Sequence, residues 1–295
     1  EPGAFLLANG RGARVAPADP LARAPFLVAA ALDLSGAEAR IRLAAPLARA
    51  ELEAIAGARI VSTEEVAWDA QAGAVRARRR RLLDALVLEE APLADADPAL
   101  VARGLCAGLR SRGLDALPWT PAARNLQARA VLMATLEPGW PDLADAALAA
   151  TLEDWLAPHL AGLCSLAELG RLDLVAILRG VLGPQRAAAL DAALPSHLAL
   201  PQGRAAIDYA RDPPTLAARA QALFGLAETP RLAGGRVRLQ IELLSPAGRP
   251  IAVTGDLAAF WRGGWAEVRK AMRGRYPRHA WPEDPMAGPA RATRP

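Results

Sequence analysis

The chain has 295 residues, of which 53% are apolar, 4% aromatic and 22% charged, and its formal net charge is +4. This apolar content excludes disorder over most of the length, because it can offset the conformational entropy of the chain. Two cysteines, Cys106 and Cys164, are too few for a disulfide scaffold and indicate reduced thiols in a cytoplasmic protein. No apolar run reaches the roughly 18 residues of a membrane span, so we expect no membrane partner.

The charge is distributed unevenly along the sequence. Residues 231–295 contain 12 basic and 5 acidic residues, whereas the rest of the chain is net acidic. Arginine supplies 34 of the 35 basic residues, which fits a GC-rich codon bias and makes arginine content alone a weak indication of a nucleic-acid ligand. The basic segment also carries Trp261, Trp265 and Trp281. This combination is typical of a nucleic-acid contact, and equally of a segment that docks on an acidic partner.

Residues 1–90 are predicted to be mostly strands. Apolar runs at 4–8 and 25–34 end at turn signals, and polar and apolar residues alternate over 39–43 and 75–78. A short helix is expected over 47–55. Several short strands with one helix between them predict an OB-like β-barrel for residues 1–90.

Residues 98–194 are predicted to form a central helical region. Thr120 and Pro121 have the pattern of an N-cap and a first helical residue, and the helix behind them is expected to end at Leu136. Ser165 and Glu168 fit a capping box, which predicts a helix with an apolar face as far as Val181. The Pro- and Asp-rich residues 91–98 are expected to be the linker from the barrel.

Residues 195–285 are predicted to form a C-terminal mixed α/β domain, so that the whole chain belongs to the α+β class. Strands are expected at 197–200, 205–209, 237–241 and 250–253, and helices over 214–224 and 256–272. Residues 286–295 are expected to be a disordered tail.

The densest charge cluster is the run of arginines from Arg76 to Arg81. Because alternate residues of a strand point to opposite faces, Arg76, Arg78 and Arg80 would share one face. Such a row could neutralise two or three phosphates. The alternative, which we prefer from the sequence, is a solvated edge strand that charge protects from aggregation.

The predicted helix over 256–272 has two different faces. Trp261 and Trp265 fall on an apolar face that is expected to be core rather than a platform for base stacking. The opposite face, available to phosphates or to an acidic partner, consists of Arg262, Arg269, Lys270 and Arg273. Residues 275–285 hold three prolines and are expected to be an extended arm that Tyr276 and Trp281 anchor across its own domain.

Motifs of catalysis are missing from the sequence. It contains no G-x-x-x-x-G-K-[ST] loop, no H-E-x-x-H, no C-x-x-C pair and no G-x-S-x-G. The three histidines, His159, His197 and His279, are far apart in the sequence. We therefore predict no catalytic residue, no cofactor site and no metal site in this chain.

Several segments resemble one family. Residues 5–13 and 19–22 look like the start of the region after the helicase core in HrpB-type bacterial ATP-dependent helicases. Leu243-Leu244-Ser245-Pro246-Ala247-Gly248-Arg249-Pro250, residues 254–257, Phe260-Trp261 and residues 274–285 look like the C-terminal signature of the same family. The resemblance covers nearly the whole chain.

The resemblance implies a parent protein similar to DEAH-box RNA helicases. In such proteins two RecA-like domains bind ATP and Mg²⁺ and hydrolyse the nucleotide, and accessory domains follow them. The chain then corresponds to the C-terminal region and is expected to be inactive alone, with no cofactor of its own. The implied partners are RNA or single-stranded nucleic acid and the helicase core of the same polypeptide, and an OB-like domain would help to hold the RNA strand.

Three functions are compatible with these observations. The first is an accessory nucleic-acid-binding region of a helicase, and the second is a protein-interaction or structural module that docks on the helicase core or on a partner protein. A free-standing nuclease or hydrolase is the weakest of the three, because spacing assembles no nucleophile, base and metal ligand.

Overall fold

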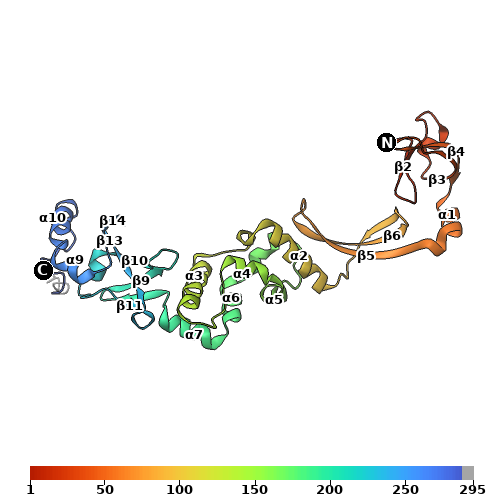
Figure 1. The fold of residues 1–295 in the computed structure, drawn as a ribbon. Coiled ribbons are helices and arrows are strands. Elements are labelled where there is room, and N and C mark those ends of the chain that lie inside the picture. The colour runs from red at the N-terminus through yellow and green to blue at the C-terminus, as the bar shows by residue number, and fades with distance from the viewer. Residues whose placement is uncertain (288–295) are drawn as a thin grey trace. The chain divides into compact units, whose positions relative to one another are not determined.

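The computed structural model describes residues 1–287 and has a mixed α/β fold, whose helices and strands are labelled in Figure 1. Its contacts divide the chain into two compact units. The first unit comprises Glu1–Ser111 and Leu160–Glu168, and the second comprises Arg112–His159 and the chain from Leu169 onward. The predicted disordered tail over 286–295 lies outside the described residues, apart from Met286 and Ala287.

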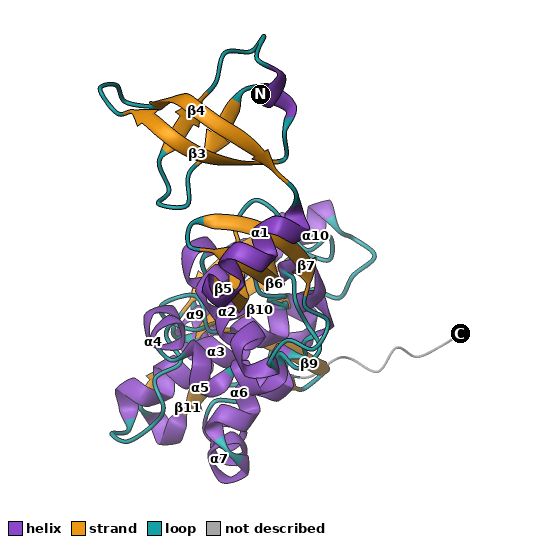
Figure 2. Cartoon of the chain, turned by 90° about the vertical axis from the view of Figure 1, so that its right-hand side faces the viewer, coloured by secondary structure: helices purple, strands orange, loops and turns teal. Residues whose placement is uncertain are grey.

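The first unit begins with a four-stranded sheet in the order β1-β2-β4-β3. Strand β2 pairs antiparallel with β1 and parallel with β4, and β3 pairs antiparallel with β4. Figure 2 shows β3 and β4 side by side, with helix α1 after them. The bounds are β1 Ala4–Leu6, β2 Gly12–Arg14, β3 Phe26–Asp33, β4 Ala39–Leu47 and α1 Arg49–Ala56.

A second, three-stranded antiparallel sheet follows, with β6 between β5 and β7. Its bounds are β5 Ile60–Asp69, β6 Ala74–Leu83 and β7 Leu86–Pro92. Leu52 and Ala56 of α1 pack with Leu83 at one end of this sheet. Apolar packing at this end fixes the position of α1 on the strands.

Helix α2, Pro98–Arg112, packs on the other end of the three-stranded sheet. A Cβ atom added at Gly108 would lie 2.6 Å from the Trp68 ring, and one added at Gly104 would lie 2.8 Å from Val75. The two glycines therefore allow the helix to approach the strands closely. The segment 160–168 is held at the same end by backbone bonds from Val75 N–H to the Cys164 carbonyl (2.7 Å) and from Leu166 N–H to the Gly73 carbonyl (3.0 Å).

The predicted OB-like barrel over residues 1–90 is not confirmed. In the described residues these strands form two separate open sheets, without a closed barrel. The physical reason lies in the middle of β5 and β6, where charged side chains occupy both faces of the sheet. A sheet with no continuous apolar face there has nothing to enclose as the interior of a barrel.

The helical part of the second unit lies mostly between residues 121 and 193. Thr120 caps α3 as predicted, since its hydroxyl oxygen accepts a bond of 3.1 Å from Ala123 N–H. The predicted helix from Ser165 is divided into a 3-10 turn over Leu166–Arg171 and α6, which Asp173 caps. The helices are α3 Pro121–Leu136, α4 Asp145–Ala150, α5 Leu152–Trp155, α6 Leu174–Leu182 and α7 Pro184–Ala193.

A five-stranded sheet in the order β14-β13-β10-β9-β8 forms the rest of the second unit, with a small β11-β12 pair. Only β10 and β13 pair in parallel within it, over the described residues. The bounds are β8 His197–Leu200, β9 Gly203–Asp208, β10 Thr215–Arg219, β11 Arg231–Leu232, β12 Val237–Arg238, β13 Gln240–Leu244 and β14 Pro250–Thr254.

Two predicted helices of this unit differ from the structure. The helix predicted over 214–224 is wrong, because this segment is strand β10 followed by the one-turn helix α8, Ala220–Leu223. The predicted helix over 256–272 is two helices, α9 Leu257–Arg262 and α10 Trp265–Arg275, which are separated at Gly263 and Gly264. Adjacent glycines have the lowest helix propensity of any residue except proline, which accounts for the break.

Candidate nucleic-acid interface

The predicted arginine row lies on β6, in the middle of the three-stranded sheet. Strands β5 and β7 both pair with β6, so the interpretation as an edge strand is wrong. Arg80 donates to Glu65 and Glu90, and Arg78 donates to Glu90 at 2.8 Å. Arg76 donates to Asp69 at 2.9 Å. Each arginine of the row therefore already has a carboxylate partner.

The opposite face of the same sheet is also ion-paired. Arg79 donates to Glu64 at 2.8 Å, and Arg81 donates to Glu53 of α1 at 3.0 Å. The hydrogen bond from Arg80 holds the pKa of Glu90 below its ordinary value, as expected for a carboxylate that accepts from a guanidinium group. The run of arginines that is most conspicuous in the sequence is thus neutralised by carboxylates of β5, β7 and α1.

The predicted basic face of the last helix is different. Arg262 of α9 and Lys270 and Arg273 of α10 are exposed. Within residues 1–287 their charged groups have no hydrogen-bond or ion-pair partner. Glu267 is the only carboxylate of the two helices. These three cations are therefore available to an anionic ligand.

Arg269, the fourth residue of the predicted basic face, has a structural partner. Its Nε–H donates to the Trp281 carbonyl at 3.1 Å, and its guanidinium group lies 4.0 Å from the Glu283 carboxylate. The Trp281 indole in turn donates to the Tyr276 carbonyl at 2.9 Å. The extended arm is thus pinned across its own domain, as predicted, and Arg269 helps to pin it.

Both tryptophans of the apolar face belong to the core, as predicted. Trp265 is 1% exposed and Trp261 is 9% exposed. The Trp265 ring lies 5.4 Å from Phe224 and 6.0 Å from Trp281, between ring centroids. Buried rings in this arrangement pack α9 and α10 onto the core of the domain and cannot stack on a base.

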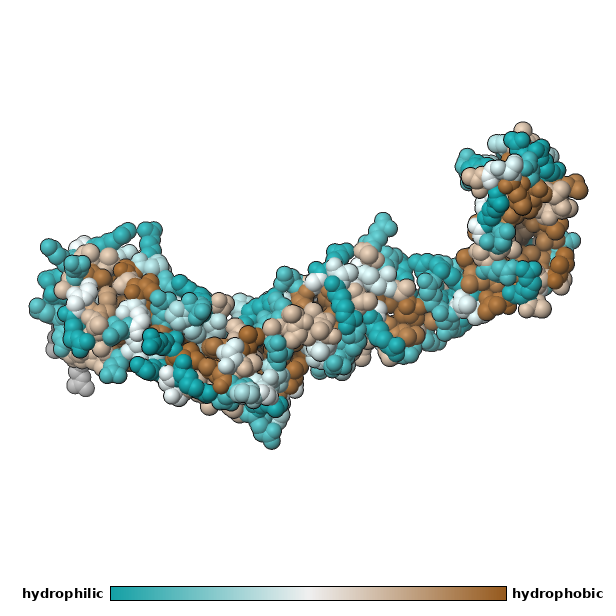
Figure 3. Space-filling model, viewed as in Figure 1, coloured by the Kyte–Doolittle hydropathy of each residue, from teal (hydrophilic) through white to brown (hydrophobic). Residues whose placement is uncertain are grey.

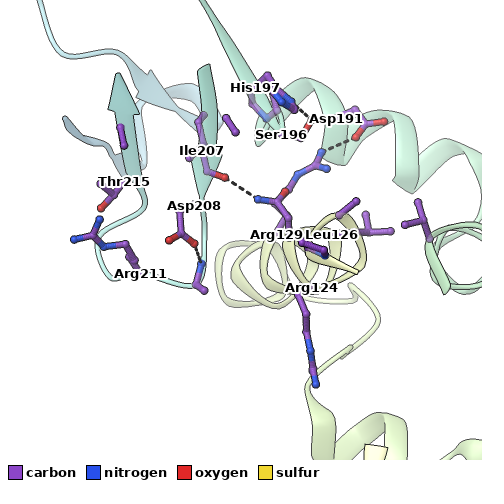
Figure 4. A pocket seen from close by; sticks show the side chains of 18 of the residues that line it. Arg124, Leu126, Arg129, Asp191, Ser196, His197, Ile207, Asp208, Arg211 and Thr215 are labelled. Atoms are coloured by element: carbon purple, nitrogen blue, oxygen red, sulfur yellow. Dashed lines mark hydrogen bonds and ion pairs between the residues drawn. The ribbon is translucent and has the colours of Figure 1, made fainter. Parts of the chain in front are cut away.

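A larger cavity of the second unit, of about 980 Å³, lies between α3, α7 and strands β8 to β10 (Figure 4). Arg129 and Arg179 both bind Asp191, at 2.5 and 2.9 Å, as Figure 4 shows for Arg129. Arg211 binds Glu242 at 2.6 Å. Most cations of this cavity are thus neutralised. The cavity is therefore a weaker site for an anion than the exposed basic face of α9 and α10.

Other functional sites find little support in the described part of the chain. No group of three or more His, Cys, Asp or Glu side chains there could hold a metal ion. Cys106 is buried. The pKa of the Cys164 thiol is raised by partial desolvation of Cys164 itself and by the Glu168 carboxylate, which disfavours a thiolate nucleophile. None of the described helices combines the length and the apolar character that crossing a membrane requires.

Comparison with known proteins places these elements in one class. Residues 155–285 match the family model described as ATP-dependent helicase C-terminal, and residues 59–93 match the model of the ATP-dependent RNA helicase HrpB connector region. The second match contains strands β5, β6 and β7 entirely. The class is therefore the C-terminal region of an ATP-dependent helicase.

The particular type follows from individual relatives. The chain is 40% identical over 99% of its length to the ATP-dependent RNA helicase HrpB of Escherichia coli K12, of which it spans 37%. Two crystal structures from E. coli are similar over 97% and 95% of the chain and 36% of theirs. They are the DExH-box NTPase HrpB (40% identity, TM-score 0.64) and the DEAH/RHA helicase HrpB (38% identity, TM-score 0.57). The chain is therefore a C-terminal region of the HrpB type.

One pair of cationic residues was missed by the sequence analysis. Arg249, in the turn between β13 and β14, and Arg275, at the end of α10, line one cleft together with Tyr276. They are 26 positions apart, and no periodicity connects them. The only signal in the sequence is that each of them lies in a segment on which the family resemblance rests, Arg249 in residues 243–250 and Arg275 in residues 274–285.

Proposed function

We propose that this chain is a cytoplasmic accessory region of an ATP-dependent RNA helicase and that it contributes contacts to RNA or single-stranded nucleic acid. The observation that carries the proposal is the excess of unpaired cations near the C-terminus. Between residues 249 and 278 there are seven basic residues and two carboxylates, Asp256 and Glu267. Asp256 is occupied in part as the cap of α9, where it accepts from Ala259 N–H at 2.9 Å.

The two predicted contact elements do not support this role equally. A phosphate that approaches Arg76, Arg78 or Arg80 would have to displace a carboxylate already in place. A phosphate that approaches Arg262, Lys270 or Arg273 displaces only water and small ions, and the release of condensed counterions favours binding. We therefore assign the contact to the α9–α10 face, with Arg269 positioning the arm rather than binding phosphate.

The test compares charge removal on the two elements in the whole chain. Binding of a fluorescent single-stranded oligoribonucleotide is measured by anisotropy over a series of salt concentrations. The triple variant R262Q/K270Q/R273Q should bind more weakly and lower the salt slope by about 0.7 for each lost phosphate contact. The matched variant R76Q/R78Q/R80Q, with the same loss of charge, should leave the slope unchanged. Equal effects of both variants would contradict the assignment.

ATP chemistry is proposed to lie outside this chain. The sequence contains no phosphate-binding loop, so its residues do not fit a bound nucleotide and Mg²⁺. The parent helicase core would supply that site. Purified chain should release no phosphate from ATP above a buffer blank, with or without RNA, and turnover in a contaminant-free sample would contradict this.

A second function, docking on the helicase core of the same polypeptide, is favoured by the surface of the first unit. Eight of the eleven large apolar side chains that are exposed in the described residues belong to residues 1–90. They are Leu6, Val28, Leu32, Leu34, Leu43, Ile55, Val61 and Val87. Figure 3 shows hydrophobic residues at the surface over this part of the chain. Apolar exposure of this extent marks an interaction surface.

Salt separates the two functions. Association of the chain with a separately expressed helicase core should persist at high salt if the apolar residues drive it, whereas RNA binding should weaken steeply. L43S/I55S should reduce the association and leave RNA binding by the α9–α10 face unchanged. The OB-like character of residues 1–90 stays a prediction, which the structure of the chain with the core would test.

A further inference from the structure

Two segments of the C-terminal domain meet at a small cleft that the α9–α10 face does not include. The cleft, of about 320 Å³, lies between the β13–β14 turn and α10 (blue in Figure 1). Its lining includes Ser245 and Arg249 from the turn and Met272, Arg275 and Tyr276 from the helix end. We propose that this cleft binds a phosphate of single-stranded RNA together with the adjoining base, which rests on and deepens the function proposed above.

The charge of the cleft is positive and not compensated. Arg249 and Arg275 are both exposed, and no carboxylate lines the cleft. In the part of the chain that the structure describes, neither guanidinium group has a hydrogen-bond or ion-pair partner. A guanidinium group offers parallel N–H donors that match two oxygens of one phosphate. Two such groups on opposite walls suit a single phosphodiester.

The walls of the cleft are held rigidly. Ser245 is 1% exposed, its N–H donates to the Arg249 carbonyl at 2.7 Å, and its hydroxyl oxygen accepts from Arg249 N–H at 3.0 Å. This reciprocal pair, together with Gly248 at φ 76°, fixes the backbone from which Arg249 extends. A fixed turn lowers the entropy that ordering the arginine on a ligand would cost.

The helix wall is equally well defined. Val268, Ala271, Met272 and Arg275 line the cleft with the i, i+3, i+4, i+7 spacing of one helix face. Tyr276 N–H closes the helix on the Met272 carbonyl at 2.7 Å, and the Tyr276 carbonyl accepts from the Trp281 indole. The buried tryptophan therefore fixes Tyr276 at the edge of the cleft.

The partial negative charge at the C-terminus of α10 opposes anion binding. Its magnitude has to be compared with the positive charge of the two arginines. The macrodipole places about half a negative charge at the C-terminus of a helix, within its last turn. Two guanidinium groups in the cleft exceed this charge. The simpler interpretation is that Arg275 is only a C-terminal helix cap. Against it, the Arg275 guanidinium group donates to no carbonyl of the helix end within residues 1–287.

The aromatic ring favours nucleic acid over an acidic protein as the ligand. Tyr276 is half-buried, and its ring centroid lies 5.9 Å from the Arg275 guanidinium carbon. An arginine beside an aromatic face is the combination that holds a phosphate and stacks the neighbouring base in proteins that bind single strands. A carboxylate side chain would use the arginines but leave the ring without a role.

The experiment measures anisotropy of a fluorescent oligouridylate with the full chain at several salt concentrations. R249Q/R275Q should weaken binding about tenfold or more at low salt and lower the salt slope by about 0.7, because the two arginines hold a single phosphate. Y276L should weaken binding about fivefold with the slope unchanged, because it removes stacking without charge. The matched control R219Q/R231Q removes two exposed arginines that lie outside the cleft.

The outcomes separate the cleft from the proposed function. If R249Q/R275Q and R219Q/R231Q lose the same affinity and slope, the cleft is not a phosphate site, while RNA binding by the chain stands. If the unmodified chain fails to bind the oligonucleotide even at low salt, both proposals fail. Competition by polyglutamate as effective as that by the oligonucleotide would identify an acidic protein as the ligand and overturn the proposal. Unchanged melting temperatures confirm that the variants are folded.

Discussion

The two groups of basic side chains in this chain have opposite surroundings. On β6, five arginines lie opposite carboxylates of β5, β7 and α1, and all five are ion-paired. On α9, α10 and the adjoining turn, five basic side chains have no hydrogen-bond or ion-pair partner within residues 1–287: Arg249, Arg262, Lys270, Arg273 and Arg275. The dense basic run on β6 therefore forms a ladder of ion pairs within the sheet. The scattered basic residues near the C-terminus form an open surface, in which no carboxylate neutralises the cations.

The difference has an energetic consequence for any anionic ligand. Exchanging a carboxylate for a phosphate on β6 replaces one ion pair with another, so the net gain is small. On α10 the ligand meets cations that only water and mobile ions surround, and the released counterions add a favourable entropy. The ladder instead holds together a sheet whose apolar packing is at its two ends, around Leu83 and around Trp68.

Replacing Trp265 with alanine should have the largest effect, because it removes the support of the open surface. The side chain is fully buried against Phe224, Trp261 and Trp281, and its indole donates to the Pro282 carbonyl at 3.0 Å. The free energy of unfolding of the second unit should fall by about 3–5 kcal/mol. Urea denaturation followed by tryptophan fluorescence measures it, and a loss below about 1 kcal/mol would show that the cluster is not the core.

Replacing Arg269 with glutamine should have a smaller effect, confined to the arm. It removes the bond to the Trp281 carbonyl and the nearby charge opposite Glu283. We expect a loss of about 1 kcal/mol in stability and faster proteolysis at residues 276–285. R273Q is the matched control, since Arg273 is exposed on the same helix and has no partner among the described residues. Identical proteolysis of the two variants would mean that Arg269 does not hold the arm.

The sequence predicted local features well and non-local ones poorly. The helical spacing of Trp261 and Trp265 predicted their burial correctly, although the single helix expected there is the two helices α9 and α10. The segment after Pro214 has good helix formers, yet β10 forms there, because β9 and β13 pair with it and bury Leu216 and Ala218. The partners of Arg80 are equally non-local: Glu65 and Glu90 lie on strands whose register the sequence did not reveal.

The stability of the first unit, which contains the paired arginines of β6, should depend on pH through Glu168. Glu168 accepts bonds from the N–H groups of Cys164 and Ser165 and from the Ser165 hydroxyl, and these lower its pKa to about 2. A carboxyl group with a lowered folded-state pKa stabilises the fold above its ordinary pKa of 4.5, and this stabilisation is lost as pH falls towards 2. The first unit should therefore lose stability below about pH 4.5, and E168Q should show a smaller dependence in that range. An equal dependence in both proteins would contradict the assignment.

The smallest expected effects provide the most direct comparison of the two regions. R80Q leaves Glu65 and Glu90 facing each other without their shared cation, so the melting temperature should fall by roughly 2 °C. Its RNA affinity and salt slope should be unchanged, since Arg80 is not available to phosphate. R273Q should do the reverse, with an unchanged melting temperature and a salt slope lower by about 0.7. Thermal melting and anisotropy on the same preparations measure both variants, each serving as the control for the other. If R80Q lowers the salt slope as much as R273Q does, the ion pairs on β6 open to admit phosphate. Ion pairing would then not determine which of the two regions binds nucleic acid.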